Sequence, residues 1–214
     1  HLTDQQRGSL LAFVAVMFIT PDSLFIRLSN IDTWGLVFYR GIIPFLTVFF
    51  GMLLIYKLNF FKILFTSGYH GIIYVVTFSI TNITFVVSIQ NTNVANTLVM
   101  IATAPMLSAI LSGIFLNEQP DKKTLISIFI TFLAIIFIFY DSLGVGNFYG
   151  DILAFITSIG LAVGAVTIRS ARSKNLVPAA VVGKLFVALF ALFFIDSFIL
   201  VEKDLIIVPL MCIL

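Results

Sequence analysis

Residues 8–27 read GSLLAFVAVMFITPDSLFIR, and residues 150–169 read GDILAFITSIGLAVGAVTIR. Placed one on the other without a gap, the two stretches share a glycine at the start, Leu-Ala-Phe at the same offset and Ile-Arg at the end. Any two apolar helices share some apolar letters, but the glycine and arginine that bracket both stretches are more specific. With two extra residues in the next loop, Arg40 aligns with Lys184. The sequence therefore indicates a duplicated helical unit, an arrangement that membrane transporters use.

The composition is that of a membrane protein. Of the 214 residues, 60% are hydrophobic and only 10% are charged. A soluble domain of this length could not bury so much apolar surface. Several apolar runs reach about 20 residues, the length at which a helix crosses roughly 30 Å of hydrocarbon. We therefore expect an all-α integral membrane protein.

The same composition argues against several classes of function. The net charge of +2 is too small to indicate a nucleic-acid partner. Cys212 is the only cysteine, and His1 and His70 are far apart, so neither a disulfide nor a metal site is predicted. The sequence shows no phosphate-binding loop, which favours a function without ATP hydrolysis and without a cofactor.

Apolar runs between polar breaks predict seven transmembrane helices and the beginning of an eighth near Leu205. The predicted ranges are 8–28, 34–56, 70–89, 94–116, 124–140, 150–170 and 178–200. The loops between them are short, which suits antiparallel neighbours in one bundle. We place a first five-helix unit at residues 1–140 and the start of a second at residues 150–214.

Lysine and arginine residues are concentrated on one side of the predicted bundle. Those on the amino-terminal side are Arg7, Lys57, Lys62, Lys122, Lys123, Arg169, Arg172 and Lys174. Arg27 and Lys203 lie on the opposite side. The positive-inside rule therefore predicts a multi-pass protein of the cytoplasmic (inner) membrane with a cytoplasmic amino terminus. The first and sixth helices then cross in opposite directions, so the two units form an inverted repeat, as alternating access requires.

The fourth predicted helix, residues 94–116, contains Pro105 near its centre. A proline removes one backbone hydrogen bond and kinks a helix. Inside a membrane the freed carbonyl needs another partner. Pro105 is therefore either a hinge or cavity wall, or a packing kink; Pro21, in the first predicted helix, is a second hinge candidate.

The stretch from Pro105 to Glu118, together with the basic residues and apolar helix that follow it, resembles the EamA domain of the drug/metabolite transporter superfamily. The resemblance covers the first repeat and about half of the second. It implies ten helices in two five-helix repeats, of which seven to eight are present here, and transport of small metabolites such as amino acids, nucleosides or amines. The sequence departs from the family at Asn117 and Gln119, where glycine and arginine are frequent.

Charged residues within the spans are the first candidates for a substrate site, because a charge at the centre of a helix costs roughly 2.5–3.5 kcal/mol. Asp22, before the end of the first helix, and Arg40, after the start of the second, lie at about the same depth. They can form a structural ion pair or a charged wall that meets a substrate. In the second hairpin, Gly164 occupies the position that Asp22 has in the first. Lys184 therefore lacks an acid in its own hairpin. It is either a snorkelling lysine or a cation that meets an anionic group.

Hydroxyl and amide side chains on the third and fourth predicted helices are the second set of candidates. The proposed substrate contacts among them are Thr81, Asn82, Asn96, Thr97 and Thr103. Such groups either line a hydrated cavity or join helices to one another, at an average of about 0.6 kcal/mol per hydrogen bond.

These features favour a secondary transporter, an importer or an exporter, that moves a small polar metabolite by alternating access. Its expected partners are the small-molecule substrate and the lipid bilayer, with a homodimer as one option. The alternatives are an integral membrane enzyme and a non-transporting membrane scaffold. The enzyme would need a nucleophile elbow or a His-Glu-x-x-His helix, and the sequence contains neither. A scaffold would have no need of the repeat.

Overall fold

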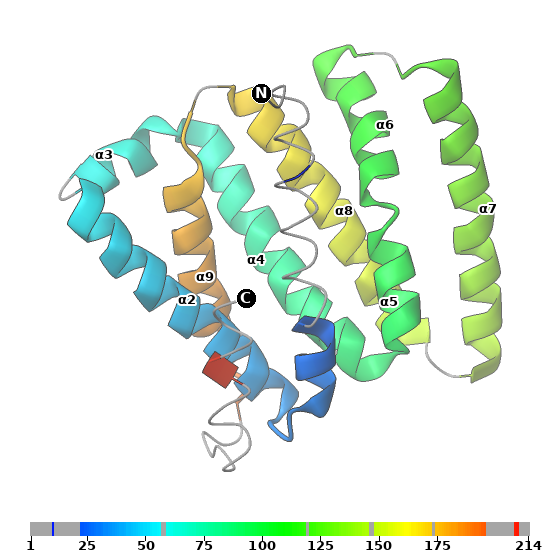
Figure 1. Ribbon diagram of the computed structural model, residues 1–214, viewed down its shortest axis with the longest axis horizontal. Coiled ribbons are helices and arrows are strands. Elements are labelled where there is room, and N and C mark those ends of the chain that lie inside the picture. The colour runs from blue at the N-terminus through cyan, green and yellow to red at the C-terminus, as the bar shows by residue number, and fades with distance from the viewer. Residues whose placement is uncertain are drawn as a thin grey trace.

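The computed structural model of the chain describes residue 10 and residues 22–56, 59–118, 120–145, 148–172, 174–195 and 208–209. Its helices are α2 (Thr33–Tyr56), α3 (Asn59–Thr66), α4 (Gly68–Asn91), α5 (Val94–Ile101), α6 (Ala104–Leu116), α7 (Lys122–Val145), α8 (Phe148–Ala171) and α9 (Val177–Ala191). The long helices stand side by side as a bundle, with α7 at one edge and α2 at the other (Figure 1). A helical segment, residues 22–28, precedes α2.

Four of the described segments are long and apolar enough to cross a membrane, which agrees with the expected all-α membrane protein. They are Thr33–Ile55, Gly68–Asn91, Val94–Leu116 and Phe148–Ala171. Each matches a predicted span to within two residues at either end. α9 is a shorter apolar helix. The total of seven to eight membrane helices and the inverted repeat remain predictions.

Three predicted boundaries were wrong. The helix expected over residues 124–140 continues to Val145 in α7. The loop expected at residues 57–67 contains α3, because its apolar side allows Phe60 to be buried with its ring 5.4 Å from that of Phe49. The helix expected over residues 178–200 ends earlier, since α9 stops at Ala191 and a turn follows. An unbroken apolar run carries no signal for where a helix ends within it. Most of the first predicted helix and the Leu205 helix start lie outside the described residues.

The junction between α6 and α7 explains the departure from the family pattern at Asn117. Asn117 ends α6 with a left-handed φ of 55°, a conformation that favours glycine but that asparagine also adopts. Asp121 then caps α7, because its Oδ1 accepts hydrogen bonds from the hydroxyl of Thr124 and, at 2.8 Å, from its backbone N–H. The hydroxyl first and then the N–H lower the pKa of the Asp121 carboxyl.

Two pairs of helices form the centre of the bundle. α4 packs most extensively against α8, and α2 packs against α9, which also contacts α4. α2 and α9 approach closely at Gly41, where an added Cβ would lie 2.7 Å from the backbone nitrogen of Ala188. α8 meets the end of α4 in the same way, because a Cβ at Gly150 would lie 2.6 Å from the carbonyl carbon of Asn91. Small residues at helix contacts are how membrane helices pack without a hydrophobic driving force.

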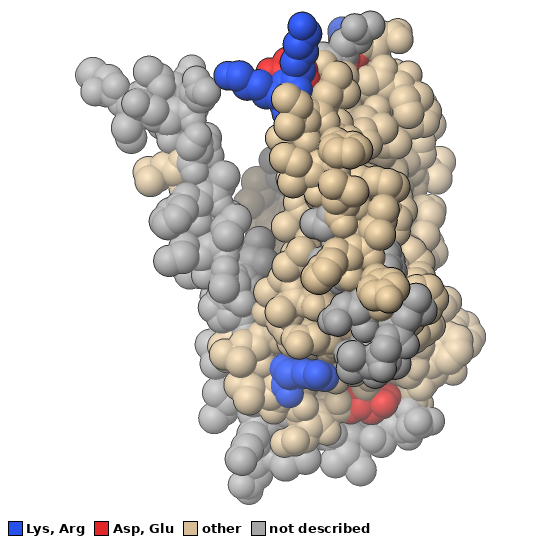
Figure 2. Space-filling view, turned by 90° about the vertical axis from the view of Figure 1, so that its right-hand side faces the viewer, with Lys and Arg blue, Asp and Glu red and all other residues tan. Residues whose placement is uncertain are grey.

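The outward faces of the helices are apolar. Large side chains such as Leu54 and Phe193 are more than four-fifths exposed. On the face that Figure 2 shows, the coloured charged side chains lie toward the two ends, with an uncharged band between them. An apolar band between two charged ends is what a hydrocarbon layer would cover.

The contact at Gly41 predicts a difference between two glycines of the same helix. Gly41→Ala should lower the stability of the protein by about 1–3 kcal/mol, because the new methyl group overlaps the α9 backbone. Gly51→Ala is the matched control, since no atom lies within 4 Å of an added Cβ there. The control should be neutral or gain up to about 1 kcal/mol, because alanine is the better helix former. Thermal unfolding in detergent measures both, and equal melting temperatures would contradict the close α2–α9 contact.

Candidate functional site

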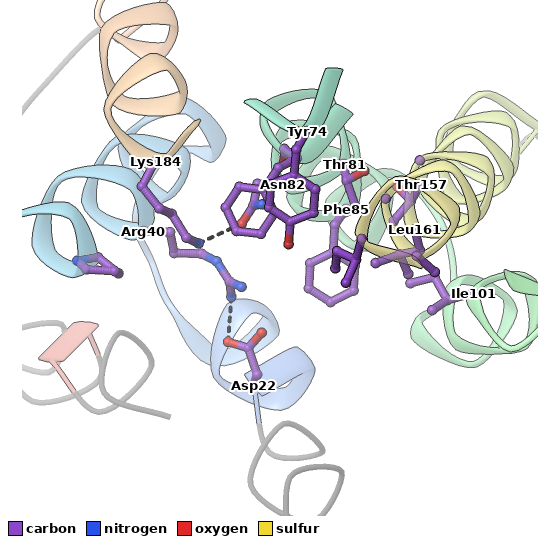
Figure 3. Close-up of a pocket in the computed structure, with 16 residues that line it drawn as sticks. Asp22, Arg40, Tyr74, Thr81, Asn82, Phe85, Ile101, Thr157, Leu161 and Lys184 are labelled. Carbon is purple, nitrogen blue, oxygen red and sulfur yellow. Dashed lines mark hydrogen bonds and ion pairs between the residues drawn. The ribbon is translucent and has the colours of Figure 1, made fainter. Parts of the chain in front are cut away.

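A cavity of about 740 Å³ lies between α2, α4, α8 and α9. Its wall is mostly apolar, and three aromatic residues of α4 contribute to it: Tyr74, Phe78 and Phe85. Five of the residues that the sequence analysis selected also line it, namely Asp22, Arg40, Thr81, Asn82 and Lys184. Figure 3 shows these five among the side chains around the cavity. The structure thus brings together residues that are up to 162 positions apart in the chain.

The predicted ion pair between Asp22 and Arg40 is present. Arg40 Nη1 lies 2.5 Å from Asp22 Oδ1, and both side chains are largely buried. The guanidinium also lies over the ring of Phe85, at 5.6 Å from its centroid. The short turn between residues 22–28 and α2 places the two charges at the same depth, as the sequence predicted. Each charge reduces the cost of burying the other, and the pair forms one end of the cavity wall.

Lys184 has a partner that its own hairpin does not supply. Its Nζ donates a hydrogen bond of 2.7 Å to Oδ1 of Asn82 on α4 and lies 5.4 Å from the centroid of the Phe78 ring. The position on α8 at which the first repeat would have an acid is Gly164, and the amide on α4 was not predicted. The helix pair that holds Lys184 is therefore α9 and α4 rather than α9 and α8.

The hydroxyl groups on the α4–α8 side of the cavity bond within the protein. The Thr81 hydroxyl donates to the carbonyl of Thr77, one turn earlier in α4, at 2.8 Å. Thr157 of α8 also lines the cavity, and its Oγ1 lies 2.7 Å from Oγ1 of Thr84. A hydroxyl that donates to a carbonyl can still accept a hydrogen bond. This side of the cavity therefore offers acceptors, whereas the α2–α9 side offers cationic donors.

Three of the predicted substrate contacts do not line this cavity. Thr97 is fully buried and bonds to Ser88 at 2.9 Å. The Thr103 hydroxyl bonds to Ser158 at 2.8 Å, and the Asn96 amide points to an acid on α8. These hydroxyls and this amide join neighbouring helices, which is the alternative role that the sequence analysis gave them.

The acid that Asn96 faces is Asp151, a residue that the sequence analysis did not select. Asp151 is fully buried in the first turn of α8, and its two carboxylate oxygens accept hydrogen bonds from Thr92 at 2.5 Å and from Asn96 at 3.5 Å. The close approach at Gly150 brings these groups together. Asp151 follows directly on the glycine that opens the second repeat and lies at the start of the span.

The helix that contains Pro105 is interrupted. α5 ends at Ile101 and α6 begins at Ala104, with Pro105 in its first turn. The Thr103 hydroxyl donates to the carbonyl of Met100 at 2.6 Å and so satisfies one of the groups at the break. Ile101 lines the cavity, so the break adjoins it. Pro21, the other hinge candidate, lies outside the described residues.

Glu118, which ends the proline-to-glutamate stretch, lies away from this cavity. It forms an exposed ion pair with Arg169 in the last turn of α8, at 2.9 Å. The pair borders a second cavity of about 460 Å³ between α6, α7 and α8, into which Pro105 and Thr124 also project. Exposed pairs of this kind contribute about 0–1 kcal/mol to stability. The pair therefore links two helix ends without fixing them firmly.

In the described part of the chain, no group of three or more histidine, cysteine or acidic residues is placed to hold a metal ion. His70 is buried and pairs with Ser170, at 3.2 Å between Nε2 and Oγ. For the chain as a whole, the absence of a metal site stays a prediction.

Comparison with known proteins identifies the family. Searches of curated proteins and of solved structures found no match. The model of the EamA-like transporter family matches residues 6–140, which is more than half of the chain. The matched region contains the interrupted helix, Glu118 and one side of the charged cavity, including Asp22 and Arg40. The chain is a membrane protein that belongs to the EamA-like transporter family.

Proposed function

We propose that the chain is a secondary transporter that binds a small polar metabolite in the charged cavity and moves it by alternating access. The observation that carries this proposal is the gathering of Asp22, Arg40 and Lys184 around one cavity between four helices. Intramembrane charges are costly, and where they face a cavity they commonly mark a substrate pathway. A cavity of this volume lies within the range of small-molecule sites.

The internal repeat supports alternating access. Arg40 and Lys184 are equivalent positions of the aligned repeats, and they line the same cavity from α2 and α9. A substrate site at the interface of two inverted repeats is the arrangement that secondary transporters use. The first repeat takes residues 1–140 and the second begins at residue 150. The family match over residues 6–140 supports the first of these boundaries.

The interrupted helix supplies a hinge in this proposal. The break between α5 and α6 lies beside the cavity at Ile101, and Pro105 prevents its repair. Rotation of α6 about the break would move the exposed Glu118–Arg169 pair at the far end of α6. Because that pair is weak, it can open and re-form during a transport cycle.

Filling the cavity tests the proposed site. Gly164 lines the cavity, and a Cβ there would approach only the ring of Tyr74, at 3.7 Å. The Cβ of Gly164→Leu therefore has room, and the rest of the side chain would extend beside the Tyr74 ring into the space of the substrate. Transport by this variant should fall to near that of cells that lack the gene. The substrate is found by comparing the metabolites of cells and medium with and without the gene.

Gly51→Leu is the matched control for this variant, because it adds the same side chain to α2 where no atom lies within 4 Å of the Cβ position. It should transport normally. Retained transport by Gly164→Leu, with equal amounts of both variants in the membrane, would remove the cavity as the substrate site.

The proposed orientation predicts which loops react with a membrane-impermeant maleimide. Single cysteines are placed in a Cys212→Ser background, because Cys212 is the only native cysteine. Asn30→Cys and Tyr149→Cys should be labelled in intact cells, since Asn30 precedes α2, Tyr149 lies exposed in the first turn of α8, and both helices enter from outside. Lys123→Cys should react only after the membrane is made permeable, because basic loops stay in the cytoplasm. Labelling of Lys123→Cys from outside would contradict the proposed orientation.

A further inference from the structure

We propose that the substrate of this cavity is an organic anion with an apolar body, such as an aromatic carboxylate. The carboxylate would bind between Arg40 and Lys184, and the apolar body would lie against the aromatic rings of α4. This inference rests on the proposed function, because it names the chemical class that the same cavity accepts. It also narrows that function, since amines and neutral nucleosides are excluded as preferred substrates.

The charge of the cavity wall favours an anion. Two cationic side chains and one carboxylate line the cavity, which leaves a net charge of +1 among the described lining residues. The carboxylate of Asp22 is in contact with Arg40, and the acceptor of the Lys184 hydrogen bond at 2.7 Å is a neutral amide. A cationic amine would add a third positive charge beside these two. An anion brings the cluster to neutrality, which matters most where little water screens the charges.

The two cations reach the same face of α4. Phe78, Asn82 and Phe85 follow one another at spacings of four and three residues, so they lie on one side of the helix. Lys184 lies over Phe78 and bonds to Asn82, whereas Arg40 lies over Phe85. Seven residues of helix span roughly 10 Å. The ammonium and the guanidinium thus extend toward one short stretch of α4, and Figure 3 shows both within the same part of the cavity.

Arg40 can bind a carboxylate and keep its ion pair. Its contact with Asp22 is made by Nη1, and a guanidinium has five N–H donors arranged as a fork. Arginine therefore suits recognition of a planar carboxylate by two parallel hydrogen bonds. Asp22 holds the guanidinium in place, so little side-chain freedom is lost when the substrate binds.

The remaining wall suits an apolar group. The rings of Tyr74 and Phe78 on α4 stack with their planes 21° apart and line the cavity. On α8, Leu161, Ala165 and Ile168 add apolar side chains to the wall. A wall of aromatic rings and apolar side chains favours an apolar body, and an aromatic ring can also pack against those rings.

Binding by an isosteric series separates charge from shape. The probes are 3-phenylpropionate, its neutral amide 3-phenylpropanamide, the cation 3-phenylpropylamine, and propionate, which has the charge without the ring. Binding to the purified full chain in nanodiscs is measured by calorimetry and by the shift in melting temperature. We expect 3-phenylpropionate to bind about tenfold or more tightly than each of the others, because hydrogen bonds to charged groups are the stronger ones.

Substitution of Lys184 tests the site within the protein. Lys184→Gln should weaken 3-phenylpropionate binding about tenfold or more and leave the weak binding of the amide unchanged. Lys184→Arg should retain the preference for the anion, since it keeps the charge. Lys174→Gln is the matched control, because Lys174 is an exposed cation outside the cavity. It should bind all four probes as the unmodified chain does.

The outcomes distinguish this inference from the proposed function. If the amine or the amide binds as tightly as the anion, and Gly164→Leu abolishes that binding, the cavity remains the site and the anion class is overturned. If the anion binds Lys184→Gln and Gly164→Leu as tightly as it binds the unmodified chain, the cavity is not the binding site. Absence of binding by all four probes also overturns the inference. The probe series on the unmodified chain decides the question even where Lys184→Gln does not fold.

Discussion

The close contact between α2 and α9 is the constraint on which the cavity depends. At Gly41 the α2 backbone lies against the backbone of Lys184 and Ala188, so these two helices cannot be separated by a side chain. Arg40 and Lys184, each next to this contact or part of it, are thereby held at the same level of the bundle. A larger residue at this position would move two intramembrane cations at once. The position of the charges is thus set by a packing contact between uncharged atoms.

Burying these two cations in the bundle costs free energy, and the groups around them reduce that cost. Arg40 obtains a carboxylate from the segment before α2, and Lys184 obtains an amide from α4. Each cation also lies over a phenylalanine ring of α4, which interacts favourably with a positive charge. Charge and aromatic rings therefore occur together for a physical reason. The same combination gives the cavity both groups that attract anions and a surface that attracts apolar molecules.

The sequence predicted much of this arrangement, and its failures have a common cause. The spans were found because apolar length is the strongest signal in a membrane protein, and the Asp22–Arg40 pair was found because a short turn fixes the relative depth of its members. Asn82 as the partner of Lys184 was missed, because the two residues are 102 positions apart and no local rule brings α9 to α4. Asp151 was missed for the same reason, since its partners lie before and within α5. Contacts within a hairpin can be predicted from spacing, whereas contacts across the bundle depend on packing.

The two main helix contacts have different roles if the repeat is inverted as proposed. The α2–α9 contact joins the second helix of each unit, so it maps onto itself when the units exchange conformations and can persist throughout a cycle. The α4–α8 contact joins the third helix of the first unit to the first helix of the second, so its counterpart lies on the opposite side of the cavity. Opening one of these contacts while the other stays closed would expose the cavity to one side of the membrane at a time. The close backbone contact and both cations lie on the persistent pair, whereas the hydroxyl groups and the aromatic wall lie on the pair that would open. A substrate held by its charge on the fixed side and by its apolar body on the moving side would thus sense, and could be released by, the opening of α4 from α8.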